Sequence, residues 1–213
     1  MTEEKAKQII LNLKQKYGRI ASELSYGNLF ELTISVVLSA QTTDRQVNAV
    51  TPALFKRYKD FNLLAVARVT DVEKIIKSVG LYKTKARNIV NLSGDIVKKY
   101  NGKLPRTREE LMKLPGIGRK SANVILSFGL KIDAFPVDTH VKRIACRIGF
   151  TQSKNLLEIE KSLTHYIPKK DWRIAHLLII NHGRKICMAR NPKCNECPIN
   201  ALCEKNDVQD SNS

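Results

Sequence analysis

Four cysteines close together in the sequence have the spacing of a metal-binding loop. They follow the pattern Cys-x6-Cys-x2-Cys-x5-Cys and are Cys187, Cys194, Cys197 and Cys203. Four thiolates within 17 residues can surround one metal centre, because a short loop can fold back on itself. Zinc sites usually pair two Cys-x2-Cys units, whereas this sequence has one such pair between wider gaps. The spacing favours a larger group, a [4Fe–4S] cluster, and leaves zinc as the alternative.

The surroundings of these cysteines are basic, and one further cysteine stands apart. A cluster held by four thiolates is negatively charged, and the nearest cations in the sequence could offset that charge. They are Arg184, Lys185, Arg190 and Lys193. Cys146 lies on an apolar helical face beside Ile144 and Ile148, so we expect it to be a small core residue.

A second segment that could take part in binding or catalysis runs from Leu114 to Lys120 and contains two glycines one residue apart. Gly116 and Gly118 allow a tight turn and a close approach by another backbone. A helical pattern begins directly after them, and a helix N-terminus presents unpaired N–H groups and a positive dipole end. The segment therefore predicts a phosphate-binding turn, with an ordinary helix–helix turn as the alternative.

Lys120 lies just inside that helix. A lysine in a basic segment usually contacts phosphate, but a helix dipole and a neighbouring cation such as Arg119 also favour the neutral, nucleophilic amine. Acids are scarce nearby, and Asp138 precedes a helical pattern that begins near Thr139, so it is predicted to be an N-cap. Asp138 could also face Lys120 and stabilise positive charge; Asp133 is the competing candidate.

Helices must position all of these groups. Apolar residues recur at three- to four-residue spacing along most of the chain, and no alternating strand pattern is present. The sequence predicts an all-α protein of roughly ten short helices, with breaks at glycine and proline. The polar end from Glu204 onward is expected to fray.

The composition restricts the possible partners. The chain has 213 residues, and 37 Lys and Arg against 20 Asp and Glu give a net charge of +17. Such an excess usually indicates nucleic acid, and residues 83–143 hold 14 basic and 5 acidic residues. No apolar run reaches the ~18 residues of a membrane helix, and the N-terminus does not match a secretory signal. We therefore expect an intracellular protein.

Four motifs occur in order along the chain. They are LSAQTTD at residues 38–44, VGLYK at 79–83, the glycine turn through Lys120, and VDTH at 137–140. Together with the cysteine spacing they resemble the endonuclease III family of DNA glycosylases, within the helix-hairpin-helix superfamily. The resemblance covers nearly the whole chain. Ile117 and Ser121 stand where Val and Thr are common in the family, and both departures are conservative.

The resemblance implies a two-lobed all-α helix-hairpin-helix glycosylase fold. Residues 22–133 would form a six-helix barrel that carries the hairpin. Residues 1–21 and 134–213 would form a discontinuous second domain that holds a [4Fe–4S] cluster through the four cysteines. DNA would lie across the cleft between the lobes.

The resemblance also implies roles for single residues. Lys120 would be the nucleophile and Asp138 its acidic partner. Gln41 and Leu81 would enter the DNA stack when a nucleotide is extruded, and the hairpin would bind DNA. The hairpin residues concerned are Gly116, Gly118 and Arg119.

The activity implied is that of a bifunctional glycosylase and AP lyase in base excision repair, which excises oxidised pyrimidines and cuts the strand by β-elimination through a lysine Schiff base. Its partner would be double-stranded DNA containing damaged pyrimidines or abasic sites. The protein would act as a monomer with no membrane contact, either at the bacterial nucleoid in the cytoplasm or in another intracellular compartment that holds DNA.

Three other functions fit parts of the sequence. A monofunctional glycosylase of the same superfamily would activate water and would not need Lys120. A non-catalytic DNA-binding module would bind duplex DNA with strong salt dependence and leave abasic DNA intact. A zinc-stabilised basic interaction protein would contain zinc without iron or sulfide.

Overall fold

The computed structural model of the chain describes residues 1–208 and divides into two compact units. One unit spans Ser22–Ile132 and is called the hairpin unit here, because it contains the glycine turn. The other combines Met1–Ala21 with Asp133–Ser213 and is called the cysteine unit.

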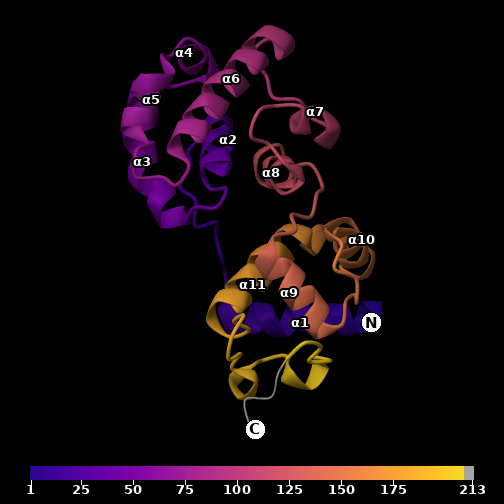
Figure 1. Ribbon diagram of the computed structural model, residues 1–213. Helices are drawn as coiled ribbons and strands as arrows, with labels where there is room; N and C mark the ends of the chain where they lie inside the picture. Colours follow the sequence, from indigo (N-terminus) through magenta and orange to yellow (C-terminus); the bar gives the residue numbers. More distant parts are fainter. Residues whose placement is uncertain (209–213) are drawn as a thin grey trace. The chain divides into compact units, whose positions relative to one another are not determined.

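The hairpin unit is built from helices joined by short turns (Figure 1). Its helices are α2 (Leu29–Leu38), α3 (Asp44–Arg57), α4 (Phe61–Ala65), α5 (Val69–Ile75), α6 (Tyr82–Tyr100), α7 (Arg108–Met112) and α8 (Arg119–Val124), which continues into a π-helical turn (Ile125–Gly129). Residues 1–208 contain no strand, so the prediction of an all-α protein is confirmed.

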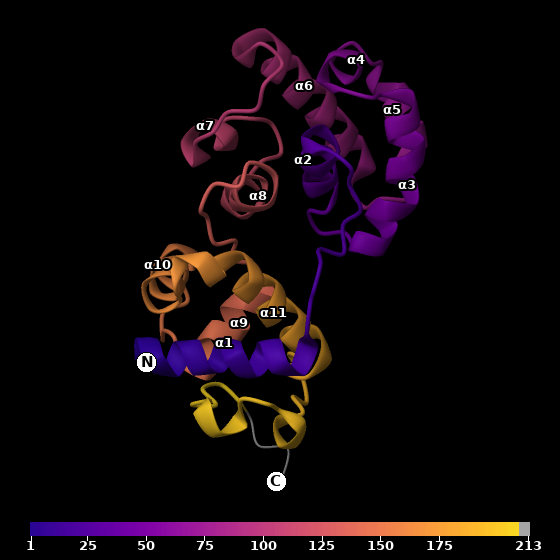
Figure 2. The ribbon, with the colours of Figure 1, turned by 180° about the vertical axis from the view of Figure 1, so that it is seen from behind.

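Helix α2 is the centre of the hairpin unit. Its residues from Leu32 to Leu38 are all buried, and the helix contacts α3, α6 and α8. Figures 1 and 2 both show α2 among these helices. A helix that is apolar on all sides belongs in a core, which is how the apolar stretch at Ile34–Ala40 folds.

Side-chain caps explain where several of these helices begin. Asn28 accepts a hydrogen bond from the Glu31 amide at the start of α2. Thr43 and Gln46 form a reciprocal capping box at the start of α3. Each cap satisfies a backbone N–H that the first helical turn leaves without an intrahelical acceptor.

The cysteine unit packs four α-helices around one core. They are α1 (Glu3–Tyr17), α9 (Thr139–Ile148), α10 (Leu156–Tyr166) and α11 (Trp172–Lys185), with short 3-10 turns at Lys169–Asp171, Cys194–Glu196 and Asn200–Leu202. Ile9 and Leu13 of α1 are fully buried together with Ile144 of α9. Helix α9 contacts both α10 and α11, and α1 contacts α11 (Figure 2).

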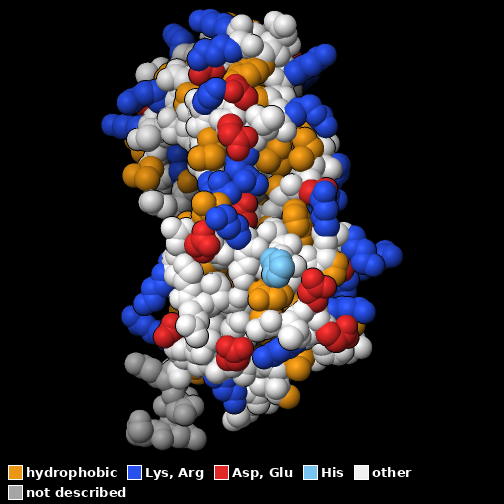
Figure 3. Space-filling model, turned by 90° about the vertical axis from the view of Figure 1, so that its right-hand side faces the viewer, with side chains coloured by type: hydrophobic (Ala, Val, Ile, Leu, Met, Phe, Trp, Pro, Cys, Tyr) orange, Lys and Arg blue, Asp and Glu red, His pale blue; other side chains and the backbone are white. Residues whose placement is uncertain are grey.

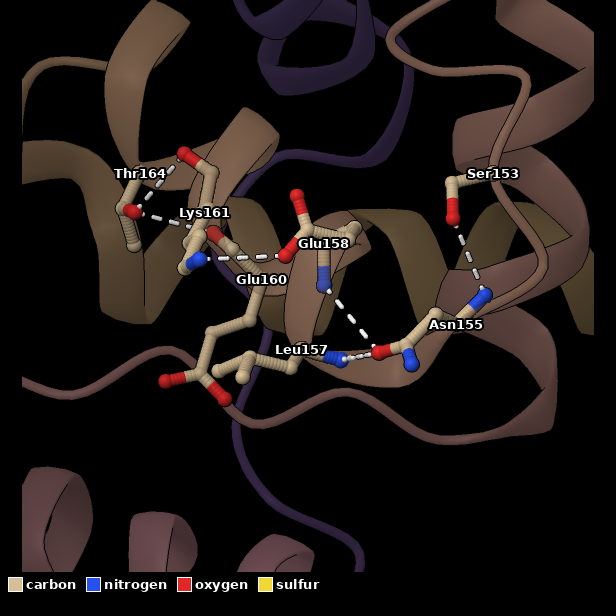
Figure 4. A network of polar contacts seen from close by, with 7 residues as sticks. All are labelled: Ser153, Asn155, Leu157, Glu158, Glu160, Lys161 and Thr164. Atoms are coloured by element: carbon tan, nitrogen blue, oxygen red, sulfur yellow. Dashed lines mark hydrogen bonds and ion pairs between the residues drawn. The ribbon is translucent and has the colours of Figure 1, made fainter.

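The start of α10 shows how polar side chains define a helix end (Figure 4). Asn155 is the N-cap, and its side-chain oxygen accepts from the Leu157 amide at 2.8 Å and from the Glu158 amide at 3.4 Å. The Ser153 hydroxyl accepts from the Asn155 amide at 3.1 Å, and Lys161 pairs with Glu158 at 3.0 Å. This network fixes the turn that joins α9 to α10.

The segment after the last cysteine is tied to α9. The Glu204 amide donates to the Ile148 carbonyl at 3.4 Å, and the Asn206 amide donates to the Arg147 carbonyl at 3.2 Å. The prediction that the chain frays from Glu204 is therefore wrong for these residues. Its remainder, residues 209–213, lies outside the described residues.

Surface charge and helix hydropathy agree with the composition. On the face shown in Figure 3, Lys and Arg side chains are spread widely and are interspersed with acidic ones. Within residues 1–208, no helix combines the length and the apolar character that crossing a membrane would need.

Candidate functional site

The glycine turn joins α7 to α8 in a conformation that requires glycine at one of its two positions. Gly116 has φ +81°, and a Cβ there would lie 3.0 Å from Val37 Cγ1 and 3.1 Å from Asn88 Nδ2. Gly118 is extended at φ −93°, and a Cβ there would meet nothing within 4 Å. Gly116 thus lets the turn pack on α2 and α6, whereas Gly118 leaves an open surface.

The backbone of the turn faces outward while its apolar side chains anchor it. Leu114 and Ile117 are buried at 3% and 5% exposure, and both glycines are exposed. Helix α8 starts at Arg119 with Gly118 as N-cap, and its first intrahelical bond runs from the Ala122 amide to the Gly118 carbonyl. The amides before Ala122 precede that first bond and can bind an anion.

Lys120 is the second residue of α8 and is half-buried. It therefore lies in the first turn of the helix that follows the two glycines. This position is compatible with contact to the same anionic ligand that the turn would bind. Lys120 belongs to the hairpin unit.

Asp138 is the N-cap of α9, as predicted from its position. Its Oδ1 accepts a hydrogen bond from the Val141 amide at 2.8 Å, and the residue is half-buried. The competing candidate, Asp133, is exposed and pairs with Lys169 at 2.9 Å. The fixed carboxylate of Asp138 is therefore the better candidate for a chemical role. Both acids belong to the cysteine unit, and their pairing with Lys120 stays a prediction.

Gln41 and Leu81 lie on neighbouring turns of the hairpin unit and share an uncommon backbone conformation. Gln41 has φ +52° and Leu81 has φ +58°, both in the left-handed region. Both are exposed, and Leu81 shows 62% of its surface. A Cβ at Gly80 would lie 3.8 Å from the Gln41 carbonyl oxygen, so the two turns touch. The structure thus has one exposed polar and one exposed apolar residue on two turns that touch.

The four cysteines line one pocket of the cysteine unit. The pocket encloses about 360 Å³ of space between atoms, part of it open to solvent, and its apolar wall includes Ile148, Ile186 and Ile199. All four cysteines are free thiols. Among the described residues, no three His, Cys, Asp or Glu side chains are grouped so as to hold a single metal ion. Four thiols around one pocket are the donor set that an iron–sulfur cluster takes.

Electrostatics explain why a metal centre suits these thiols. Burial, together with the nearby Cys203, Cys187 and Cys194, raises the pKa of Cys197 to about 11. Burial also raises the pKa of Cys203. Four thiolates in one pocket repel one another, and positively charged iron would stabilise them. The residues present therefore fit the predicted cluster.

Two arginines of α9 support the cysteine loop. Arg147 is only 6% exposed, and its guanidinium donates to Cys187 Sγ at 3.5 Å, to the Met188 carbonyl at 2.6 Å and to the Ala189 carbonyl at 3.0 Å. Arg143 donates to the Cys187 carbonyl at 2.9 Å. These contacts hold the first cysteine and place positive charge where a cluster would be negative.

A chain of polar contacts runs from α1 to the pocket. The Tyr17 hydroxyl lies 2.8 Å from His182 Nδ1, and His182 Nε2 lies 3.6 Å from Cys197 Sγ. Burial and the charge of Arg143 lower the pKa of His182 to about 4. The Lys205 amide also donates to Cys203 Sγ at 3.4 Å. Such contacts orient the sulfur atoms of a metal site.

The cations predicted from sequence proximity are only partly those that the structure places at the pocket. Of the four, Lys193 lines the pocket, whereas Lys185 Nζ lies 5.9 Å from the centroid of the Tyr17 ring. Arg143 and Arg147 were missed because they lie about 40 residues earlier in the chain. Their four-residue spacing on one helix was the available signal.

Two family models match the chain. The model described as HhH-GPD superfamily base excision DNA repair protein covers residues 34–169. The model of the iron–sulfur binding domain of endonuclease III covers residues 187–203, which is the span from the first to the last pocket cysteine. The chain's cofactor is therefore a [4Fe–4S] cluster, as predicted.

Individual relatives match over nearly the full length. Endonuclease III of Bacillus subtilis (strain 168) is 42% identical, across 94% of this chain and 97% of that protein. The Synechocystis sp. (strain ATCC 27184 / PCC 6803 / Kazusa) endonuclease III is 43% identical, across 94% of this chain and 92% of that protein. A solved structure of a trapped endonuclease III–DNA covalent intermediate, an estranged-adenine complex, is 43% identical. It has a TM-score of 0.90 and covers 96% of this chain and 97% of that chain. The resemblance seen in the sequence motifs is confirmed: the chain belongs to the endonuclease III family, within the HhH-GPD superfamily of base excision DNA repair proteins.

Proposed function

We propose that this chain is a bifunctional DNA glycosylase and AP lyase that excises oxidised pyrimidines from double-stranded DNA and cuts the resulting abasic sites. The observation that carries the proposal is the 43% identity to an endonuclease III trapped as a covalent intermediate with DNA. A covalent intermediate requires a nucleophile, and Lys120 supplies an amine at the start of α8. The proposed form is a monomer acting at the bacterial nucleoid.

The two units are proposed to be the two lobes that the family fold implies. Lys120 of the hairpin unit and Asp138 of the cysteine unit would then both act on the bound DNA. The exposed backbone at Gly116 and Gly118 would bind phosphate through its N–H groups, and Arg119 would add charge.

The damaged nucleotide must leave the base stack before its sugar can be attacked. Gln41 and Leu81 are proposed to fill the space that it leaves. An exposed apolar side chain such as Leu81 is costly in water, and a wedge between bases recovers that cost.

The chemical step is proposed to start from the neutral amine of Lys120. The Nζ atom forms a bond to C1′, and the glycosidic bond breaks, so that the base leaves with the electron pair and takes up a proton. The sugar ring opens to an imine, which makes the C2′ proton acidic. Loss of that proton breaks the C3′–O bond, and water then hydrolyses the imine and frees Lys120. The Asp138 carboxylate would stabilise the cationic sugar and move protons.

The cysteine loop is proposed to act on DNA through its shape. The cluster, when bound, cross-links four points of residues 187–203 and supplies no reaction step. The loop would place basic side chains such as Lys193 toward the DNA backbone.

The test is borohydride trapping on a duplex that contains one abasic site. We expect the wild-type protein to form a covalent complex and Lys120→Ala to form none, whereas the control Lys113→Ala should be trapped normally. Lys113 is exposed and pairs with Glu110 on α7. Asp138→Asn should keep its affinity for DNA and lose about 100-fold in turnover.

The alternatives give different results in the same assay. A monofunctional glycosylase would release the damaged base and leave no trapped complex. A non-catalytic binding module would retain duplex DNA without releasing a base or cutting an abasic site. Either result with wild-type protein would reject the lyase assignment.

A further inference from the structure

A buried lysine joins the two turns that carry Gln41 and Leu81. Lys85, in the first turns of α6, is only 4% exposed. Its Nζ donates a hydrogen bond to Thr42 Oγ1 at 2.5 Å. Thr42 follows Gln41 directly in the chain, so the bond links α6 to the turn that precedes α3.

Thr42 also contacts the residues that precede Gln41. The Thr42 hydroxyl donates to the Ala40 carbonyl at 3.4 Å, and the Thr42 amide donates to the Ser39 carbonyl at 3.1 Å. The residues before and after Gln41 are therefore both held by contacts that meet at Thr42. This arrangement restrains the left-handed conformation of Gln41.

The same lysine also restrains Leu81. The Lys85 amide donates to the Leu81 carbonyl at 3.0 Å, in the first intrahelical hydrogen bond of α6. Leu81 is the N-cap of that helix, and its left-handed backbone receives no side-chain cap. One residue thus contacts both turns, through its backbone on one side and its side chain on the other.

The chemistry of Lys85 is unusual for a position that only packs. Removing a charged amine from water costs free energy that burying an apolar side chain of the same length would not cost. Burial lowers the pKa of Lys85 for this reason. A methionine would fill the volume without that cost, so the polar group points to a role in geometry.

We propose that Lys85 is a positioning residue that holds the Gln41 and Leu81 turns in one fixed arrangement, so that both side chains enter the DNA stack together. Lys85 itself does not touch DNA in this proposal. The inference rests on the proposed function, since it concerns how the damaged nucleotide is extruded.

The test measures extrusion apart from the chemical step. Every variant is made in the Lys120→Ala background and mixed with duplex DNA that carries 2-aminopurine opposite an abasic site. Fluorescence of 2-aminopurine rises when the base loses its stacking partners. The informative changes are Lys85→Met, Thr42→Val and their combination; Thr42→Ser keeps the hydroxyl, and Lys98→Met changes an exposed lysine of the same helix.

We expect Lys85→Met and Thr42→Val each to reduce the unstacking equilibrium by about tenfold, with unchanged affinity for undamaged duplex. The double variant should be no worse than the poorer single variant, because both remove the same hydrogen bond. Thr42→Ser and Lys98→Met should behave as the parent.

If Thr42→Val unstacks the base as fully as the parent protein does, the proposal is overturned. This outcome can be read even if Lys85→Met does not fold. Equal losses in unstacking and in thermal stability, with Thr42→Ser impaired as well, would reduce Lys85 to a packing residue. Failure of the lyase assignment looks different. Wild-type Lys120 would then escape borohydride trapping, while the fluorescence differences among these variants would remain.

Discussion

The glycine turn and the cysteine loop are both proposed to hold a negatively charged group, a DNA phosphate at the turn and an iron–sulfur cluster at the loop. They would do so with different chemical groups. At Leu114–Gly118 the groups proposed to bind an anion are backbone amides, and the buried side chains of Leu114 and Ile117 anchor the turn. At residues 187–203 the proposed ligands are cysteine side chains, and the loop is held by guanidinium groups from α9. Both segments depend on distant parts of the chain: the turn packs on α2 and α6, and the loop is held by residues of α9 about 40 positions away.

The largest effect is expected from removing one thiol of the cysteine loop. Cys194→Ser should lose iron and most of the stability of the cysteine unit, because structural metal sites can contribute about 10 kcal/mol to folding. Iron content and thermal unfolding measure both losses. The matched control is Cys146→Ser, since Cys146 lies outside the pocket and its thiol contacts the Ser153 carbonyl at 3.5 Å. A folded, iron-free Cys194→Ser protein would contradict a structural role for the cluster.

The next largest effect is expected from removing the hydrogen bonds that Arg147 of α9 donates to the cysteine loop. Arg147→Met keeps the length of the side chain but leaves the Met188 and Ala189 carbonyls without their donor, at a cost of about 2–5 kcal/mol. We expect lower thermal stability and faster loss of iron to a chelator. Arg190→Met, at an exposed residue of the same loop, should retain both. Equal behaviour of the two variants would show that the loop does not rely on α9.

The glycine turn should respond unequally at its two glycines. Gly116→Ala should destabilise the hairpin unit by about 1–3 kcal/mol, because φ is positive and the new Cβ meets Val37 and Asn88. Gly118→Ala should change the free energy of unfolding by less than about 0.5 kcal/mol, since its Cβ enters open space. Gly118→Ala should instead weaken the affinity for DNA, measured by titration. Identical stability of both variants would refute this division of roles.

The smallest effect is a pH dependence at α7. Hydrogen bonds from Lys113 and Tyr100 lower the pKa of Glu110, although burial opposes the shift. A carboxyl whose pKa is lower in the folded state stabilises the fold above its unfolded pKa, and this stability is lost as the pH falls through the folded value. Wild-type protein should thus lose stability below about pH 4.5, and Glu110→Gln should lose less.

The control for this pH dependence is Glu109→Gln, at an exposed residue of the same helix. Thermal unfolding of the three proteins between pH 3 and pH 7 would measure the effect. If Glu110→Gln lost more thermal stability than wild type as the pH falls, the effect would have the opposite sign and would contradict this prediction.

The sequence predicted best what is local. The all-α fold followed from the apolar periodicity, and the family followed from short motifs. The Asp138 cap followed from its place just before a helical pattern. The iron–sulfur segment could be predicted because its four cysteines lie within residues 187–203, the span that the family model matches. Each of these features depends on neighbours in the chain.

The sequence could not predict contacts between distant segments. The spacing of Arg147 shows only which helix face it shares, not that its guanidinium reaches Cys187. Nothing in the sequence marks Lys85 as the partner of Thr42. The packing of whole helices decides both contacts. The fraying predicted from Glu204 failed for the same reason, because the polar segment finds its acceptors on α9.

The most direct test of the account is to locate the bond between protein and DNA. The wild-type protein is reduced with borohydride on abasic duplex DNA, digested with protease, and analysed by mass spectrometry for the peptide that carries the sugar remnant. We predict the adduct on Lys120 alone, with none on the neighbouring Lys113 or Lys131. An adduct on another lysine or on the N-terminal amine, with Lys120 unmodified, would contradict the central claim that the glycine turn carries the nucleophile.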